Sequence, residues 1–148
     1  MRIFALIFIT AALAGCGSLD SFSGTGLVKV LPHFLDESGR HTDGVTLLHR
    51  DGYQHQLRNN PKLVHGVRYE VNWYGAGEVT VRLELRSTKA GTDPMTLEQV
   101  VSVPASRSHW TPMLLDAETY KTFGQPQAWR VTLWQGGRQI DEQKSFLW

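Results

Sequence analysis

Five of the six histidines lie in one stretch of the chain, and imidazole nitrogens are common ligands of zinc and other transition metals. They are His33, His41, His49, His55 and His65. A metal site would need two or three of them to converge, but His49 and His55 are six residues apart and do not share a helical face. We therefore interpret them as solvated loop histidines, and we assign no metal ligand and no cofactor.

Hydroxyls stand beside an imidazole in Ser106-Arg107-Ser108-His109. A catalytic triad needs side chains that converge on one substrate atom, whereas neighbours on an extended segment point where the pleat directs them. The chain also has no Gly-x-Ser-x-Gly elbow. The acidic pairs Asp36-Glu37 and Asp141-Glu142 diverge on a strand and do not suit glycoside hydrolysis. The sequence predicts no catalytic residue, so an enzyme is the least favoured class of function.

The chain has five tryptophans, whose indole rings can pack in a core or stack on the faces of sugars. Trp73 and Trp129 alternate with valines and leucines and should be buried. Trp134 lies on the opposite face of its strand from Trp129, and Trp148 is the last residue of the sequence. We take Trp134 and Trp148 as candidate ligand contacts, with packing as the competing use.

The single cysteine, Cys16, follows a short apolar run. The chain begins with Met1-Arg2, continues through the apolar residues 3–9, and tapers into the small residues 10–12. A charged start, an apolar middle and a small-residue end are typical of a secretory signal. The apolar part is shorter than the roughly 20 residues that a helix needs to cross a bilayer, so a retained membrane-spanning helix is not favoured.

The four residues Leu13-Ala14-Gly15-Cys16 resemble the lipobox of bacterial lipoproteins. The resemblance implies cleavage before Cys16, a diacylglycerol on its sulfur and an acylated amino group. Residues 1–15 are then a cleaved signal peptide, and residues 16–26, rich in glycine and serine, a lipidated flexible tether. Each buried methylene contributes about 0.8 kcal/mol, so two or three acyl chains anchor a protein firmly. Because Gly17 rather than an aspartate follows Cys16, the resemblance implies the outer membrane, facing the periplasm.

The rest of the chain, residues 27–148, has the length of a single domain. The formal net charge is +1 at pH 7 and includes Arg2, which lies in the predicted signal peptide. Such a balance of charges does not favour nucleic acid as a partner. With Cys16 carrying lipid, no thiol remains for a disulfide or for thiol catalysis. The fold must therefore be stabilised by packing.

Alternating apolar and polar residues predict strands, and turn residues separate each predicted strand from the next. We expect strands at residues 27–31, 67–74, 79–86, 95–103, 109–115, 127–135 and 138–148, and short helices at 52–58 and 117–123. The clearest pattern places Gly75-Ala76-Gly77 as a hairpin loop, with Trp73 opposite Val79, Glu70 opposite Arg82, and Arg68 opposite Glu84. The alternative is that these two strands belong to opposite sheets, joined across the end of a sandwich.

This count of about seven strands predicts a mainly β fold and resembles an immunoglobulin-like antiparallel β-sandwich with one or two short helices in the connections. Such folds do not determine function. We expect a non-catalytic binding or envelope-assembly module whose partner is an envelope protein or a glycan. The alternative is a carbohydrate- or peptidoglycan-binding module that uses exposed aromatic rings. A flat exposed strand edge would favour the first hypothesis, and rings clustered in a groove would favour the second.

Overall fold

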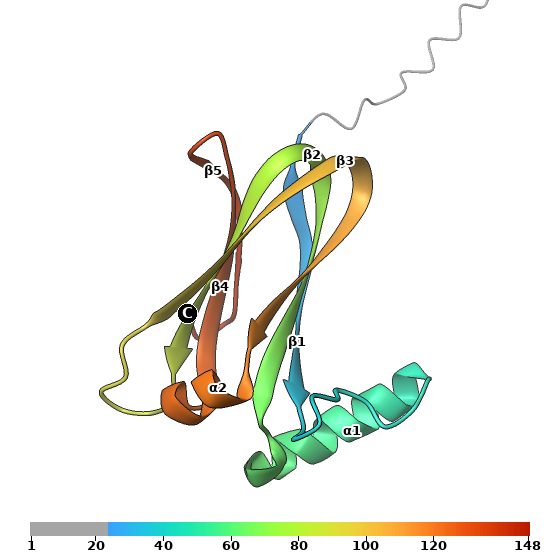
Figure 1. Cartoon of the computed structure of the whole chain (residues 1–148), viewed down its shortest axis with the longest axis vertical. Coiled ribbons are helices and arrows are strands. Elements are labelled where there is room, and N and C mark those ends of the chain that lie inside the picture. Colours follow the sequence, from blue (N-terminus) through green and yellow to red (C-terminus); the bar gives the residue numbers. More distant parts are fainter. Residues whose placement is uncertain (1–23) are drawn as a thin grey trace, which may run out of the picture.

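The computed structural model describes residues 24–148, which form a mainly β fold with two helices (Figure 1). The predicted signal peptide, Cys16 and the tether up to residue 23 lie outside the described residues. In chain order the elements are β1 (Gly26–Leu35), α1 (Leu47–Asn59), the 3-10 turn η1 (Pro61–Leu63), β2 (Gly66–Ser87), β3 (Met95–Leu115), α2 (Ala117–Phe123), β4 (Pro126–Gln135) and β5 (Arg138–Lys144). No helix among these residues is long and apolar enough to cross a membrane.

Two long strands, β2 with 22 residues and β3 with 21, run through the whole sheet. The first half of β2 lies between β1 and the second half of β3, and its second half lies between the first half of β3 and β4. All of these pairings are antiparallel, and β5 completes the sheet beside β4. The sheet therefore curls over on itself (Figure 1). Residues 24–148 form five strands, which does not confirm a seven-strand sandwich.

The predicted hairpin at Gly75-Ala76-Gly77 is wrong. The backbone bends there, with φ of +141° at Gly75 and +83° at Gly77, but the chain continues in the same strand. A β-carbon on Gly75 would clash with the hydroxyl oxygen of Thr25, so this position needs glycine for space as well as for φ. The bend carries β2 from one layer of the curled sheet to the other, but both halves belong to one strand of one sheet and not to the two separate sheets of the alternative.

The side-chain pairs expected from that hairpin are replaced by others. Trp73 pairs with Leu27 and His109, and Val79 pairs with Val101. The expected ion pairs are likewise absent, and the charged residues find nearer partners: Arg68 with Glu70, Arg82 with Glu98, and Glu84 with Arg130. The bend moves the second half of the strand away from the first, so a register drawn across the loop does not apply.

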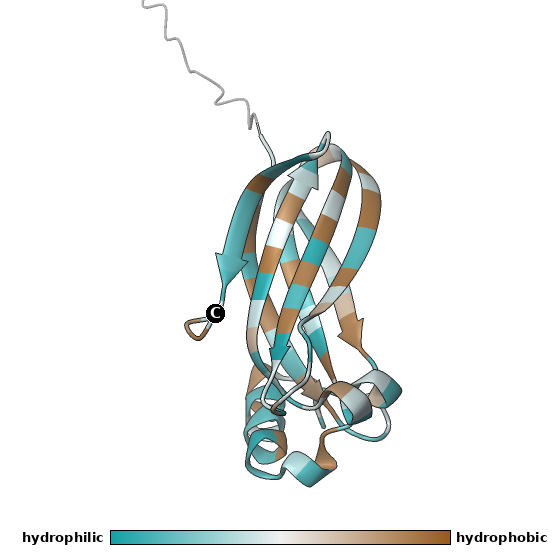
Figure 2. Cartoon of the chain, turned by 90° about the vertical axis from the view of Figure 1, so that its left-hand side faces the viewer, coloured by the Kyte–Doolittle hydropathy of each residue, from teal (hydrophilic) through white to brown (hydrophobic). Residues whose placement is uncertain are grey.

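The alternation itself predicts the core correctly. The eight apolar residues of β2 assigned to one face are each at most 2% exposed: Val67, Tyr69, Val71, Trp73, Val79, Val81, Leu83 and Leu85. The alternating bands of hydropathy along the strands are visible in Figure 2. Trp129 is partly buried and meets Tyr69 edge-on, with 6.4 Å between the ring centres. The core thus lies between the two layers of the curled sheet.

Both helices lie at the end of the sheet opposite the bend (Figure 1). Helix α2 matches its prediction, because Asp116 accepts a hydrogen bond from the backbone of Thr119 at 2.8 Å and Gly124 ends the helix. Helix α1 is longer than the predicted 52–58 and begins after Thr46, whose hydroxyl accepts from the backbone of His49 at 3.3 Å. The predicted start at residue 52 is therefore too late, because Thr46 caps the helix.

Candidate functional site

The two candidate tryptophans lie on the solvent side of the sheet, and both are half-buried. The guanidinium carbon of Arg82 is 4.6 Å from the centre of the Trp134 ring. Two arginines approach Trp148, with Arg86 at 4.2 Å and Arg130 at 4.9 Å from the ring centre. Both rings are therefore already engaged in cation–π contacts, each worth about 0.5–1 kcal/mol at exposed sites.

Ion pairs hold two of these arginines in place. Arg82 donates to Glu98 at 2.5 Å, and Arg130 makes two bonds to Glu84 at 2.7 and 2.8 Å. The hydrogen bond and charge of Arg130 lower the pKa of Glu84 against the desolvation that raises it. A sugar stacked on a ring would have to compete with these guanidinium groups for the ring face. The geometry therefore offers less to a glycan than exposed, unpaired rings would.

A hollow of about 360 Å³ lies beside Trp134, lined by Glu78, Thr80, Arg82, Glu98, Trp134, Gly136 and Gly137. Trp134 is the only aromatic residue in this lining, and its indole nitrogen donates to the hydroxyl of Thr132 at 2.9 Å. Trp148 is not part of the lining. The structure thus does not bring the two candidate rings together in one groove.

The histidines do not all behave as the solvated loop residues predicted. His33 is only 9% exposed and lies against His41, with 5.2 Å between ring centres. Burial, then the neighbouring His41, Arg50 and Arg68, lowers the pKa of His33 to about 4. The prediction is wrong for His33 because helix α1 covers the end of β1, which the sequence pattern did not show. His33 Nδ1 has no hydrogen-bond partner in the described part of the chain.

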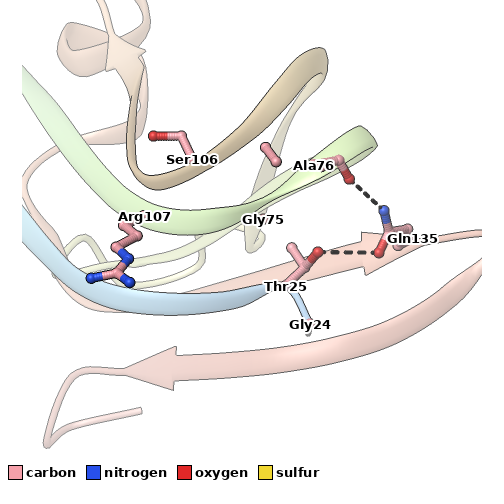
Figure 3. A pocket seen from close by; sticks show the side chains of 8 residues that line it. Gly24, Thr25, Gly75, Ala76, Ser106, Arg107 and Gln135 are labelled. Carbon is pink, nitrogen blue, oxygen red and sulfur yellow. Dashed lines mark hydrogen bonds between the residues drawn. The ribbon is translucent and has the colours of Figure 1, made fainter. Parts of the chain in front are cut away.

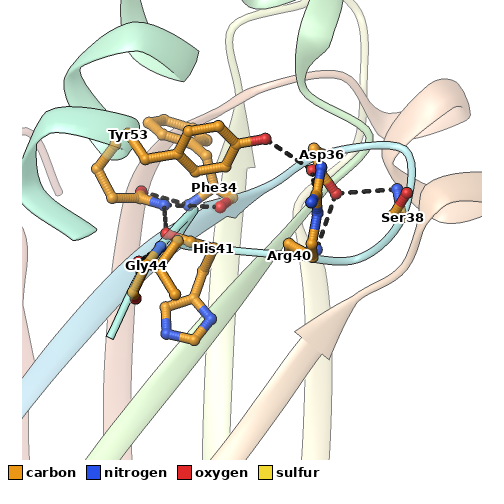
Figure 4. A network of polar contacts seen from close by, with 9 residues as sticks. Phe34, Asp36, Ser38, Arg40, His41, Gly44 and Tyr53 are labelled. Carbon is orange, nitrogen blue, oxygen red and sulfur yellow. Dashed lines mark hydrogen bonds and ion pairs between the residues drawn. The ribbon is translucent and has the colours of Figure 1, made fainter. Parts of the chain in front are cut away.

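A polar network fixes the loop that follows β1 against helix α1 (Figure 4). The amide of Gln54, which is 6% exposed, accepts from the backbone of Phe34 at 2.8 Å and donates to the carbonyls of Phe34 and His41 at 2.8 and 2.9 Å. Asp36 accepts from the hydroxyl of Tyr53 at 2.6 Å and from Arg40 at 2.9 Å. Although desolvation raises it, these bonds hold the pKa of Asp36 at about 2.

The histidines of this region make contacts that stabilise the local structure. Arg68 Nη2 lies 3.2 Å from Nδ1 of His41, so a cation occupies the place that a metal ion would need. His49 and His55 are exposed and bond locally, to Thr46 at 2.7 Å and to Asn59 at 2.8 Å. Across residues 24–148, no group of three or more histidine, cysteine or acidic side chains could hold a metal ion.

The Ser106–His109 segment forms no nucleophile and base pair. The Ser106 hydroxyl donates to the carbonyl of Ser108 at 3.2 Å, and the Ser108 hydroxyl accepts from Asn72 at 2.8 Å. The His109 ring lies 4.5 Å from that of Trp73, and its Nε2 is 3.0 Å from the carbonyl of Gly75. These side chains stabilise the bend between the two halves of β2 and β3.

A hollow of about 410 Å³ lies at this bend (Figure 3), lined by Gly24, Thr25, Gly75, Ala76, Ala105, Ser106, Arg107 and Gln135. Gln135 closes one side by accepting from the Thr25 hydroxyl at 3.2 Å and donating to the carbonyl of Ala76 at 2.9 Å. Arg107 is the only ionisable side chain in the lining. The hollow therefore lacks the paired acid and base that hydrolytic chemistry needs.

A further feature, which the sequence did not single out, is the free edge of β3. This strand pairs with β2 on one side along its length, and no other strand among residues 24–148 pairs with it. In its first half, Met95–Val103, the side chains of Thr96, Glu98, Gln99, Val100 and Ser102 are exposed. Val100 is 61% exposed, and the strand offers unpaired backbone groups beside it.

The other edges of the sheet carry protection that this segment lacks. Natural edges are blunted by proline, by lysine and by other charges. β1 contains Lys29 and Pro32, the second half of β3 contains Pro112, and β5 carries charges at Arg138, Asp141, Glu142 and Lys144. Residues 95–103 hold one charged residue, Glu98, which Arg82 already neutralises. We call this segment the open edge; its flanking Pro94 and Pro104 and its single charged residue are the sequence signals that could have revealed it.

No protein-family model, no curated protein and no solved structure matches the chain.

Proposed function

We propose that this protein is a lipid-anchored envelope protein that binds another protein without catalysis, by accepting a strand at its open edge. The observation that carries the proposal is the open edge, nine residues with no proline and no lysine, whose one charged residue, Glu98, is paired with Arg82, beside three edges that carry such protection. Strand addition would satisfy its backbone groups, and the half-buried side chains of Met95, Leu97, Val101 and Val103 would extend an apolar surface toward the incoming strand.

The anchor is the sequence-based part of the proposal. The apolar run and the lipobox-like Leu13-Ala14-Gly15-Cys16 support secretion and attachment of lipid at Cys16, on the periplasmic side of the outer membrane. Gly24, the first described residue, lies eight positions after Cys16, so an extended connection would reach about 27 Å. The anchor would therefore keep the bend end of the domain near the membrane surface.

Replacement of Cys16 by alanine tests the anchor. Cys16→Ala should abolish incorporation of a labelled palmitate analogue, because the chain has no other thiol to accept a diacylglycerol. Uptake of label by the variant at the wild-type level would remove the lipoprotein assignment.

The edge is tested by a photoreactive amino acid at position 100 of the full chain in native membranes. We expect a discrete protein adduct whose crosslink maps to the open edge. Gln99→Lys should abolish that adduct, since a charge at the edge opposes strand pairing. Gln99→Thr, which keeps the strand and adds no charge, is the matched control and should retain it. No adduct, or an adduct that Gln99→Lys leaves unchanged, would overturn the proposal.

The carbohydrate-binding alternative has less support. It needs ring faces at Trp134 and Trp148 that a sugar can reach, and arginines lie against both rings. Binding of peptidoglycan fragments that Trp134→Ala weakens, without a matching loss of stability, would favour it over strand addition.

A further inference from the structure

We infer that the strand accepted at the open edge is the open edge of a second copy of this chain, paired antiparallel about a two-fold axis at Gln99. This inference rests on the proposed function and names its partner.

The position of two prolines defines the register. Proline cannot donate to a strand ladder, so Pro94 and Pro104 limit the segment that can pair to residues 95–103. These prolines are equally spaced about Gln99, five residues before and five after it. Antiparallel pairing centred there places each proline opposite the other, outside the ladder, and leaves all nine residues between them paired. A register centred on Val100 would instead bring Pro104 opposite Thr96, inside the ladder.

The side chains suit the same register. On the inner face, Met95 would lie opposite Val103 of the second copy and Leu97 opposite Val101, so that each of these four half-buried apolar residues pairs with another apolar residue. A register centred on Val100 would place Gln99 opposite Val101 on this face. The Gln99 register keeps the apolar set together.

The outer face places no like charges directly opposite each other. Thr96 would lie opposite Ser102, and Glu98 would lie opposite Val100 of the other copy. Glu98 is the one charge in the segment, and its carboxylate is held at 2.5 Å by Arg82 of the neighbouring strand. No like charges face each other across the axis, so the segment is complementary to itself.

Anchoring makes such a contact effective. A nine-residue strand pair buries little surface and would be weak between freely diffusing molecules. Copies held on one membrane share a small volume, which raises their effective concentration. The second copy is therefore a partner that the anchor itself brings to the edge.

Single cysteines in the full chain test the register, because Cys16 carries lipid in the proposed mature protein and an introduced cysteine is then the only free thiol. In native membranes with copper phenanthroline as oxidant, Gln99→Cys should form a disulfide-linked dimer that a reductant separates, since residues on the axis lie about 5 Å apart. Thr96→Cys should not, since its two copies would be about 20 Å apart. Coexpression of Thr96→Cys with Ser102→Cys should restore a mixed dimer.

The outcomes separate the two proposals. Equal dimer formation by Gln99→Cys and Thr96→Cys would indicate random collision and overturn the inference, and so would failure of the mixed pair. Absence of any Gln99→Cys dimer, with a position-100 adduct to a different protein that Gln99→Lys abolishes, would refute pairing between copies and keep strand addition. If Gln99→Lys kept both the position-100 adduct and the protein captured in it, strand addition and pairing between copies would both be refuted.

Discussion

Acidification should destabilise this protein through His33. The ring is 9% exposed, and its pKa falls from 6.5 to about 4 because burial, His41, Arg50 and Arg68 disfavour the imidazolium while Asp51 favours it. Between these two pH values the unfolded chain binds a proton that the folded protein does not. The stability associated with the neutral ring is therefore fully present above pH 6.5 and is lost as the pH falls toward 4.

The size of the effect follows from the two pKa values. At pH 4.5 the difference in proton binding amounts to about 2–3 kcal/mol relative to pH 7.5. His41, whose pKa burial and Arg68 also lower, acts in the same direction. His33→Phe keeps an aromatic ring beside His41 and removes the titrating group. Over this pH interval its free energy of unfolding should therefore fall by about 2–3 kcal/mol less than that of the wild type.

Urea unfolding of the full chain at pH 7.5 and 4.5 measures this difference. His55→Phe, on the exposed side of α1, is the matched control and should keep the wild-type loss of stability. An equal loss in wild type and His33→Phe would refute the reasoning, because it would mean that His33 is protonated in the folded protein at pH 4.5.

Two further predictions concern the fold. Val71→Asp should unfold the protein, because it places an unpaired charge at a position that is 0% exposed. Arg82→Ala should cost about 1 kcal/mol or less, since it removes partly exposed contacts. Thermal melts compare the two variants, and similar melting temperatures would contradict the assignment of faces. Gln54→Ala should cost about 2–4 kcal/mol in urea unfolding, because it leaves backbone groups of Phe34 and His41 without their partner; a loss below 1 kcal/mol would show that water replaces the amide.

Patterns local in sequence predicted much of this fold. Alternation assigned the core face of β2, and the predicted bounds 117–123 of α2 match the helix that Asp116 and Gly124 cap. The bend at Gly75 could not be told from a hairpin loop, because both need a glycine with positive φ. What separates them is the pairing of β2 with β3, which joins residues far apart in the chain.

The candidate site was less predictable for the same reason. Whether a strand lies at an edge depends on the order of strands in the sheet, so the exposure of Val100 could not be derived from its neighbours in sequence. The burial of His33 depends on helix α1 crossing the end of β1. Alternation placed Trp134 on the face opposite Trp129, but it did not place Trp148, and the arginines against both rings come from other positions along the chain.

The continuity of β2 has a consequence for how the domain opens. In a sandwich of separate strands, one layer can detach while the other persists. Here the same backbone is the central strand of both layers, between β1 and β3 on one side of the bend and between β3 and β4 on the other. Neither layer can lose β2 without disrupting the other, so amide protons on both sides of Gly75 should exchange only through a single global opening event.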